Sequence, residues 1–181
     1  LSPFRRAETT VNRILAEYPV QYEKRYHNPF HSLVGTILSQ NTSGSNRESA
    51  FNSLDREVGI NPYYIDEAPE SKIKDAIRSA GMYNQRTKVL KRVSRIIIEK
   101  YDGNLKPLFD LPFNEARDRL MELPGLGPTN ADVALMIAAD RKVIPVDKHI
   151  ERIRKRSKLL PQTRTHESLK LHHQDDQTTP T

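Results

Sequence analysis

The 181-residue sequence contains no cysteine and no tryptophan, and none of its apolar runs is long. Without thiols the chain can form no disulfide, no thiolate zinc site and no cysteine-held iron–sulfur cluster. No run approaches the roughly 18 apolar residues that a membrane span requires, and the first residues lack the apolar core of a signal peptide. The sequence therefore predicts a soluble, intracellular protein, long enough for one sizeable domain or two small ones sharing a core.

Positive charge exceeds negative charge along the chain. Lys and Arg number 29 against 23 Asp and Glu, which gives a net charge of +6 and a pI of about 9.5. The basic residues concentrate at 86–100 and 141–158. Such a field attracts polyanions, so nucleic acid is the first candidate partner, with a merely solvated basic surface as the alternative.

Apolar residues recur with helical spacing wherever a pattern can be read. The residues from Phe30 to Leu38 and from Val89 to Tyr101 follow the i, i+3, i+4, i+7 spacing of one buried helix face, with Arg86 on another face of the second helix. Turn signals separate the helical stretches, and the patch around Ile60 reads as a loop. We predict an all-α fold with helices at 7–17, 30–38, 45–56, 69–79, 89–101, 114–122, 128–139 and 148–158.

The helices are expected to form two lobes. Residues 29–139 would make a central helical lobe with a hairpin at 123–128, and residues 1–28 plus 140–161 would make the second lobe. The stretch 162–181 is rich in Thr, Gln, His and Asp and poor in apolar residues, so we predict a disordered tail.

The segment Leu123-Pro-Gly-Leu-Gly-Pro128 lies between two helical patterns and predicts a tight helix-to-helix connection. Glycine allows the backbone to turn where a side chain would clash, and Pro128 suits the first position of a helix. Amides near Gly125 and Gly127 would then point outward at the positive end of a helix dipole, which predicts an anion site. A simple turn between two helices is the alternative.

This hairpin is followed by Ala131-Asp-Val-Ala134 and by Val146-Asp-Lys-His-Ile-Glu-Arg-Ile153, and it is preceded by Ile37-Leu-Ser-Gln-Asn-Thr42 and Gly81-Met-Tyr-Asn84. Together these motifs resemble the endonuclease III family of helix-hairpin-helix DNA glycosylases, over roughly residues 6–158. The resemblance implies a base excision repair enzyme that acts on double-stranded DNA with a damaged, mismatched or abasic nucleotide. It also implies that the two helical lobes flank a DNA cleft. It also implies a monomer located in the cytoplasm at the nucleoid of a prokaryotic cell.

The resemblance also implies roles for individual residues. Backbone groups of Pro124, Gly125, Leu126 and Gly127 would hold the DNA backbone. Gln40 or Asn41, with Met82 on a facing loop, would fill the gap left by an extruded nucleotide. The carbonyls of Met121, Leu123 and Leu126 would hold a monovalent cation that bridges to a phosphate.

Asp147 matches the essential carboxylate of the family. Loss of a base leaves positive charge on the sugar, which a fixed carboxylate stabilises while water attacks. The helix that begins at Pro128 is about 18 Å long, and the linker 140–146 can span about 23 Å when extended. Because the linker can be longer than the helix, Asp147 can lie beside Thr129 at the start of that helix. Asp147 also directly precedes a helix, and capping that helix is the structural alternative.

Thr129 stands where bifunctional relatives carry a lysine that forms a Schiff base. A threonine hydroxyl cannot form an imine, so we predict a monofunctional enzyme in which Asp147 assists water. Lys148 is expected to contact a phosphate. Two alternatives remain: an abasic-site lyase that uses another amine such as Lys148, and a non-catalytic DNA-binding module.

Many relatives carry four C-terminal cysteines that hold an iron–sulfur cluster, and this sequence has none. Either this branch dispenses with the cluster or the chain is truncated or altered. His27 and His31 are four residues apart, but Pro29 between them argues against a shared metal. We therefore expect no cofactor apart from the monovalent cation.

Overall fold

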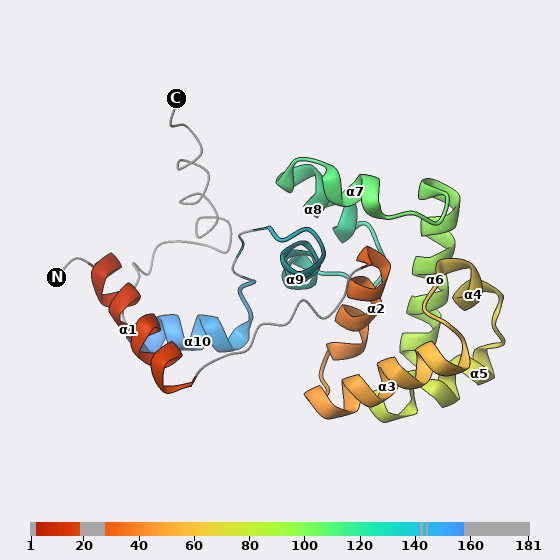
Figure 1. Cartoon of the computed structure of the whole chain (residues 1–181), viewed down its shortest axis with the longest axis horizontal. Coiled ribbons are helices and arrows are strands. Elements are labelled where there is room, and N and C mark those ends of the chain that lie inside the picture. The colour runs from red at the N-terminus through yellow and green to blue at the C-terminus, as the bar shows by residue number, and fades with distance from the viewer. Residues whose placement is uncertain (1–2, 19–27, 142, 144, 158–181) are drawn as a thin grey trace. The chain divides into compact units, whose positions relative to one another are not determined.

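The computed structural model describes residues 3–18, 28–141, 143 and 145–157, and every regular element within these residues is a helix (Figure 1). No helix among them is long and apolar enough to cross a membrane. The elements are α1 (Pro3–Glu17), α2 (Pro29–Ser39), α3 (Gly44–Glu57), α4 (Pro62–Glu67), α5 (Glu70–Ala76), the 3-10 helix η1 (Arg78–Ala80), α6 (Tyr83–Tyr101), α7 (Lys106–Asp110), α8 (Phe113–Met121), α9 (Pro128–Ala138) and α10 (Lys148–Ser157).

Local sequence explains where several of these helices begin. Asn28 accepts a hydrogen bond from the Phe30 amide at 2.8 Å, and Asn61 accepts one from the Tyr63 amide at 2.9 Å. In both cases a proline follows the capping asparagine at the first helical position. The asparagine side chain accepts a hydrogen bond from one of the unpaired amides of the first helical turn, and proline has no amide hydrogen that would need a partner. Both features favour a helix start.

The all-α fold predicted from the sequence is confirmed, but three details differ. The helix predicted over 69–79 ends at Ala76 and continues as the separate turn η1. Helix α4 begins at Pro62, directly after the stretch read as loop, and α7 was not predicted. Both missed helices are very short, at 6 and 5 residues, so neither offers a periodic pattern. The predicted tail at 162–181 lies outside the described residues.

Contacts between Cα atoms divide the chain into two compact units. Unit 1 comprises Leu1–Lys24 and Ile144–Thr181, and unit 2 comprises Arg25–Val143. Within unit 2, α2 packs on α3, α6 and α9, and α4 and α5 pack on α6. By these bounds, unit 2 also contains the hairpin and the loops at 40–42 and 80–82.

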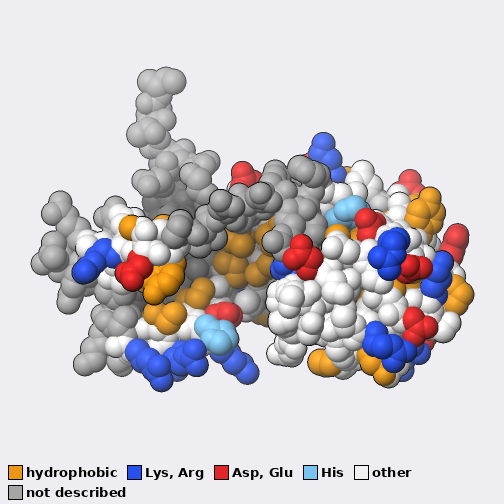
Figure 2. All heavy atoms as spheres, turned by 60° about the horizontal axis from the view of Figure 1, so that its bottom comes forward, with side chains coloured by type: hydrophobic (Ala, Val, Ile, Leu, Met, Phe, Trp, Pro, Cys, Tyr) orange, Lys and Arg blue, Asp and Glu red, His pale blue; other side chains and the backbone are white. Residues whose placement is uncertain are grey.

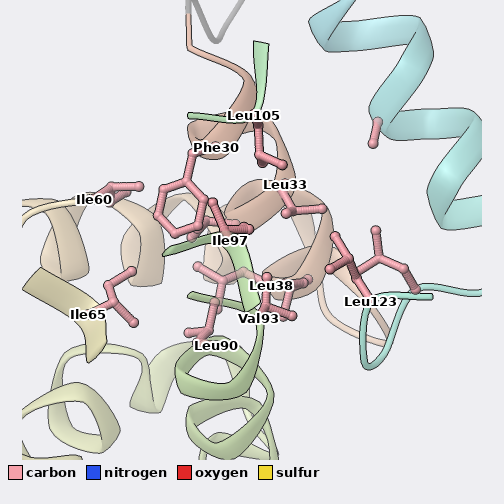
Figure 3. Packing of buried hydrophobic residues seen from close by; sticks show 14 of the residues in the cluster. Phe30, Leu33, Leu38, Ile60, Ile65, Leu90, Val93, Ile97, Leu105 and Leu123 are labelled. Atoms are coloured by element: carbon pink, nitrogen blue, oxygen red, sulfur yellow. The ribbon is translucent and has the colours of Figure 1, made fainter. Parts of the chain in front are cut away.

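The core of unit 2 forms around α2 and α6. Figure 3 shows side chains from these two helices, among them Leu33, Leu38, Leu90 and Ile97, pointing toward one another. Each of these four is at most 1% exposed, and full burial of one such side chain contributes about 1.5–3 kcal/mol. Leu123 from the hairpin joins the same cluster, so the hairpin rests on a rigid support.

In unit 1, α10 carries a strongly polar surface. Lys148, Arg152, Lys155 and Arg156 are exposed, and Figure 2 shows Lys and Arg side chains gathered along one side of this unit. Lys155 forms an ion pair with Glu151 at 3.5 Å. Exposed cations of this kind are suited to a polyanionic partner.

Candidate functional site

The connection between α8 and α9 is a tight turn held by buried leucines. Leu123 and Leu126 are 3% and 4% exposed, and the Leu126 amide donates to the Leu123 carbonyl at 3.2 Å. Gly125 adopts φ +79°, a left-handed conformation that favours glycine. A Cβ atom at Gly125 would lie 3.0 Å from Cγ1 of Val89 on α6, so the turn approaches α6 closely.

The outer side of this turn presents open backbone amides. Gly125 and Gly127 are exposed, and within the described residues neither their amides nor that of Asn130 donate to an acceptor. Gly127 is the N-cap of α9 and Pro128 is its first residue. Three amides at the positive end of a helix dipole, with no side chain on either glycine, form an arrangement suited to a phosphate.

The carbonyls expected to hold a cation lie on the same turn. Among the described residues, those of Met121 and Leu126 accept no hydrogen bond, while that of Leu123 accepts one from Leu126. A carbonyl oxygen has two lone pairs, so all three can still coordinate a cation. Since the Leu126 side chain is buried, any contact of this residue with DNA must use its backbone.

A buried ion pair fixes the two helices of the hairpin. Arg117 on α8 donates through Nε to Oδ1 of Asp132 on α9 at 2.7 Å, and the Asp132 side chain is 0% exposed. This pair holds α8 against α9 next to the turn. The sequence does not predict this pair, because an Arg and an Asp that are 15 positions apart match no known helical or motif spacing.

Gln40 and Asn41 have different environments. Gln40 is half-buried and donates through Nε2 to the Gly125 carbonyl at 3.0 Å, which ties the end of α2 to the hairpin. Asn41 is exposed and adopts φ +51°. Gln40 thus has a structural partner, and Asn41 is the side chain of the two that is available to a ligand.

Met82 shares the unusual features of Asn41. Its side chain is 55% exposed, and its backbone is left-handed at φ +48° just before α6. A left-handed backbone is costly for residues with a Cβ atom and persists only where the surroundings impose it. Two exposed side chains thus project from constrained positions on two separate loops.

Arg86 joins these two loops. Its side chain is only 5% exposed. The guanidinium donates to the carbonyls of Ile37 and Gln40 at the end of α2. It also donates to those of Gly81 at 2.8 Å and Ala80 at 3.4 Å. Burial lowers the pKa of this guanidinium below its ordinary value. The prediction that Arg86 lies on a face of its helix other than the buried apolar face is therefore wrong.

Asp147 caps α10, as its position before the helix predicts. Its Oδ1 accepts hydrogen bonds from the amides of His149 at 2.9 Å and Ile150 at 2.8 Å. Asp147 and Lys148 are both exposed, and no other hydrogen bond to the Asp147 carboxylate occurs among the described residues. Asp147 belongs to unit 1 and Thr129, half-buried on α9, to unit 2. That Asp147 comes close to Thr129 remains a prediction, based on the length of the chain between them.

The donor set for an iron–sulfur cluster is absent, because the sequence has no cysteine. Within the described residues, no group of three or more His, Asp or Glu side chains could hold a metal ion. His31 lies with Nε2 3.0 Å from the carbonyl of Ile60, and His27 lies outside the described residues.

These features define a class: an all-α protein with a helix-hairpin-helix whose turn exposes backbone amides. Residues 34–175 match the model of the HhH-GPD superfamily of base excision DNA repair proteins. Since that match covers most of the sequence, the chain belongs to the HhH-GPD superfamily.

Curated relatives include endonuclease III from Thermotoga maritima, 30% identical over 149 residues, which cover 82% of this chain and 65% of that protein. Endonuclease III from Sulfolobus acidocaldarius is 34% identical over 70% of this chain and 55% of that protein. The chain thus spans less than two thirds of the length of these relatives.

Solved structures show the same fold. A trapped covalent intermediate of endonuclease III with DNA superposes with a TM-score of 0.74 at 25% identity, covering 91% of this chain and 73% of that chain. A thermostable thymine-DNA glycosylase superposes with a TM-score of 0.67 at 23% identity, covering 81% of this chain and 65% of that chain.

Proposed function

We propose that this protein is a DNA glycosylase of base excision repair that extrudes a damaged or mismatched nucleotide and hydrolyses its N-glycosidic bond. The observation that carries the proposal is the hairpin with open amides beside two exposed left-handed residues, Asn41 and Met82, in a member of this superfamily. Such a surface offers both a grip on a phosphate and side chains that can enter a base stack.

Binding would begin at the DNA backbone. The amides of Gly125 and Gly127 would donate to phosphate oxygens, and a monovalent cation on the carbonyls of Met121, Leu123 and Leu126 would neutralise the same charge. Lys148 would contact a further phosphate.

Extrusion of a nucleotide costs a few kcal/mol in lost stacking and pairing. Met82 would offset part of that cost by placing an apolar side chain into the gap, and Asn41 would contribute polar contacts to the exposed base edges. The other candidate, Gln40, has its side-chain amide engaged with Gly125. The structure therefore favours Asn41 over Gln40 for this role.

In the chemical step the bond between C1′ of the sugar and the base nitrogen would break, and its electron pair would leave with the base. The Asp147 carboxylate would stabilise the resulting positive charge on the sugar. Water would then add to C1′, and its proton would pass to Asp147 or to solvent. The products would be the free base and an abasic site.

Thr129 would restrict the enzyme to this reaction, because a hydroxyl cannot form the imine through which a lysine cleaves the strand. A lyase that uses Lys148 is the second candidate, since this exposed amine directly follows Asp147 in the chain. Borohydride reduction traps an imine between amine and sugar. We expect no efficient trapping for the monofunctional enzyme and efficient trapping for a lyase.

The deciding experiment is a panel of duplexes that contain uracil, thymine opposite guanine, an oxidised pyrimidine, or adenine opposite a damaged guanine. Each duplex is incubated with the protein and analysed with and without alkali. Strand nicking only after alkali is the expected result for at least one lesion. Nicking without alkali would indicate the lyase, and binding without any release of base would indicate a non-catalytic module.

A further inference from the structure

Arg86 has a hydrogen-bond arrangement that a purely local role in α6 does not require. It lies in the first turns of that helix, yet its guanidinium donates to four carbonyls outside the helix. Within the described residues, Arg86 forms no ion pair with a carboxylate. Burial of a guanidinium without a counterion is costly, so the carbonyls must compensate for a large loss of hydration.

The four carbonyls belong to the two loops that carry the exposed left-handed residues. Ile37 and Gln40 close α2 directly before Asn41, and Ala80 and Gly81 directly precede Met82. Carbonyls at the end of α2 lie at the negative end of its dipole, where a cation is favourable. The planar fork of arginine carries five donors and can therefore span both loops at once.

The same network reaches the hairpin. The backbone of Gln40 accepts from Arg86, and the side chain of Gln40 donates to the carbonyl of Gly125 at 3.0 Å. One buried guanidinium thus connects, through Gln40, the three backbone segments that face DNA in the proposed function.

We propose that Arg86 is a positioning residue that fixes the spacing between Asn41 and Met82, so that both side chains enter the base stack together when a nucleotide is extruded. This inference rests on the proposed function. Loss of the guanidinium should slow extrusion and leave the chemical step on an already extruded nucleotide intact.

Lys91 provides a matched control on the same helix. Its ammonium also donates to backbone carbonyls, at 2.7 Å to Asp66 and 2.7 Å to Ala68, but these lie around the end of α4. Lys91→Met should therefore lower stability, as Arg86→Met should, without affecting extrusion. Arg86→Lys retains the charge with at most three donors and should give an intermediate result, which keeps the test meaningful if Arg86→Met fails to fold.

Base release is measured in single turnover on two duplexes that carry the same lesion. In the first the lesion is paired, and in the second it faces an abasic site, so no pairing opposes extrusion. We expect the Arg86 variants to slow release from the paired duplex about 10- to 100-fold and to change release from the second duplex little. Equal slowing on both duplexes, or no slowing by any folded variant, would overturn the inference.

A fluorescence measurement separates this inference from the proposed function. The probe is 2-aminopurine next to a tetrahydrofuran abasic analogue, and its fluorescence rises when the stack opens. Wild type and Lys91→Met should give the full rise, and the Arg86 variants a smaller rise at saturating protein. If wild type raises the fluorescence but releases no base from any duplex, the glycosylase proposal fails while the positioning role is still tested by the variants. An equal rise for all proteins would overturn that role.

Discussion

Substitution of Gly125 by alanine tests whether the left-handed turn determines the geometry of the hairpin. The backbone at this position has φ +79°, and an added Cβ would lie 3.0 Å from Cγ1 and 3.6 Å from Cγ2 of Val89. A left-handed backbone costs a residue with a side chain about 1–2 kcal/mol, and the close contact with Val89 adds to this. We expect Gly125→Ala to lower the free energy of unfolding by about 2 kcal/mol, a fall in Tm of about 4–8 °C for a chain of this size.

Two other glycines provide matched controls. A Cβ atom at Gly127 or Gly44 would meet nothing within 4 Å. Alanine at Gly44 should therefore change stability by less than about 0.5 kcal/mol, and alanine at Gly127, the N-cap of α9, should cost about 1 kcal/mol at most because alanine caps a helix less well than glycine. Gly127→Ala should nevertheless weaken DNA binding, since its methyl group would stand beside the open amides, and Gly44→Ala should not.

Urea unfolding followed by far-UV circular dichroism suits this series, because the chain has no tryptophan. Val89→Ala combined with Gly125→Ala should recover the part of the loss that comes from the contact and not the part that comes from the backbone. An unfolding midpoint for Gly125→Ala equal to that of Gly44→Ala would refute the reasoning.

The remaining predictions concern the hairpin helices and the charges. Arg117→Met removes the guanidinium from the buried carboxylate of Asp132 and should cost about 3–5 kcal/mol in urea unfolding; a loss below about 1 kcal/mol would show that the pair does not hold the helices. Thr129→Lys should give a borohydride-trapped adduct with lesion DNA that wild type does not give, and absence of the adduct in a folded, DNA-binding variant would contradict the assignment of this position. Lys148→Gln should reduce the slope of log affinity against log salt by about 1; an unchanged slope would exclude a phosphate contact.

The sequence predicted the long helices because their burial repeats with a regular period. Helix α6 shows this pattern over 19 residues, whereas α4 has only 6. The stretch around Ile60 was predicted to be a loop, although Asn61 followed by Pro62 is also the pattern of a helix start. Helix α4 packs against α6 and α7 packs against α8, and no local pattern in the sequence reports such contacts.

The site was predictable where it depends on local chemistry. The glycines of the hairpin, Pro128 at the start of α9 and the capping role of Asp147 all follow from residue type and position. Arg86 did not, because arginine is usually exposed. Its spacing of four residues from buried Leu90 places it on the apolar face and was the available signal. Asparagine adopts a left-handed backbone more readily than most residues, so Asn41 carries a weak signal in the sequence, whereas the left-handed backbone of Met82 carries none.

The most direct test of the account is base release by Asp147→Asn in single turnover on the lesion duplex that wild type processes. Asparagine caps a helix about as well as aspartate, so folding and DNA affinity should be preserved, while the rate of base release should fall about 10²- to 10⁴-fold because no carboxylate stabilises the sugar. Asp147→Ala should lose the same activity and, in addition, about 1 kcal/mol of helix stability. Release of base by Asp147→Asn at the wild-type rate would contradict the central claim.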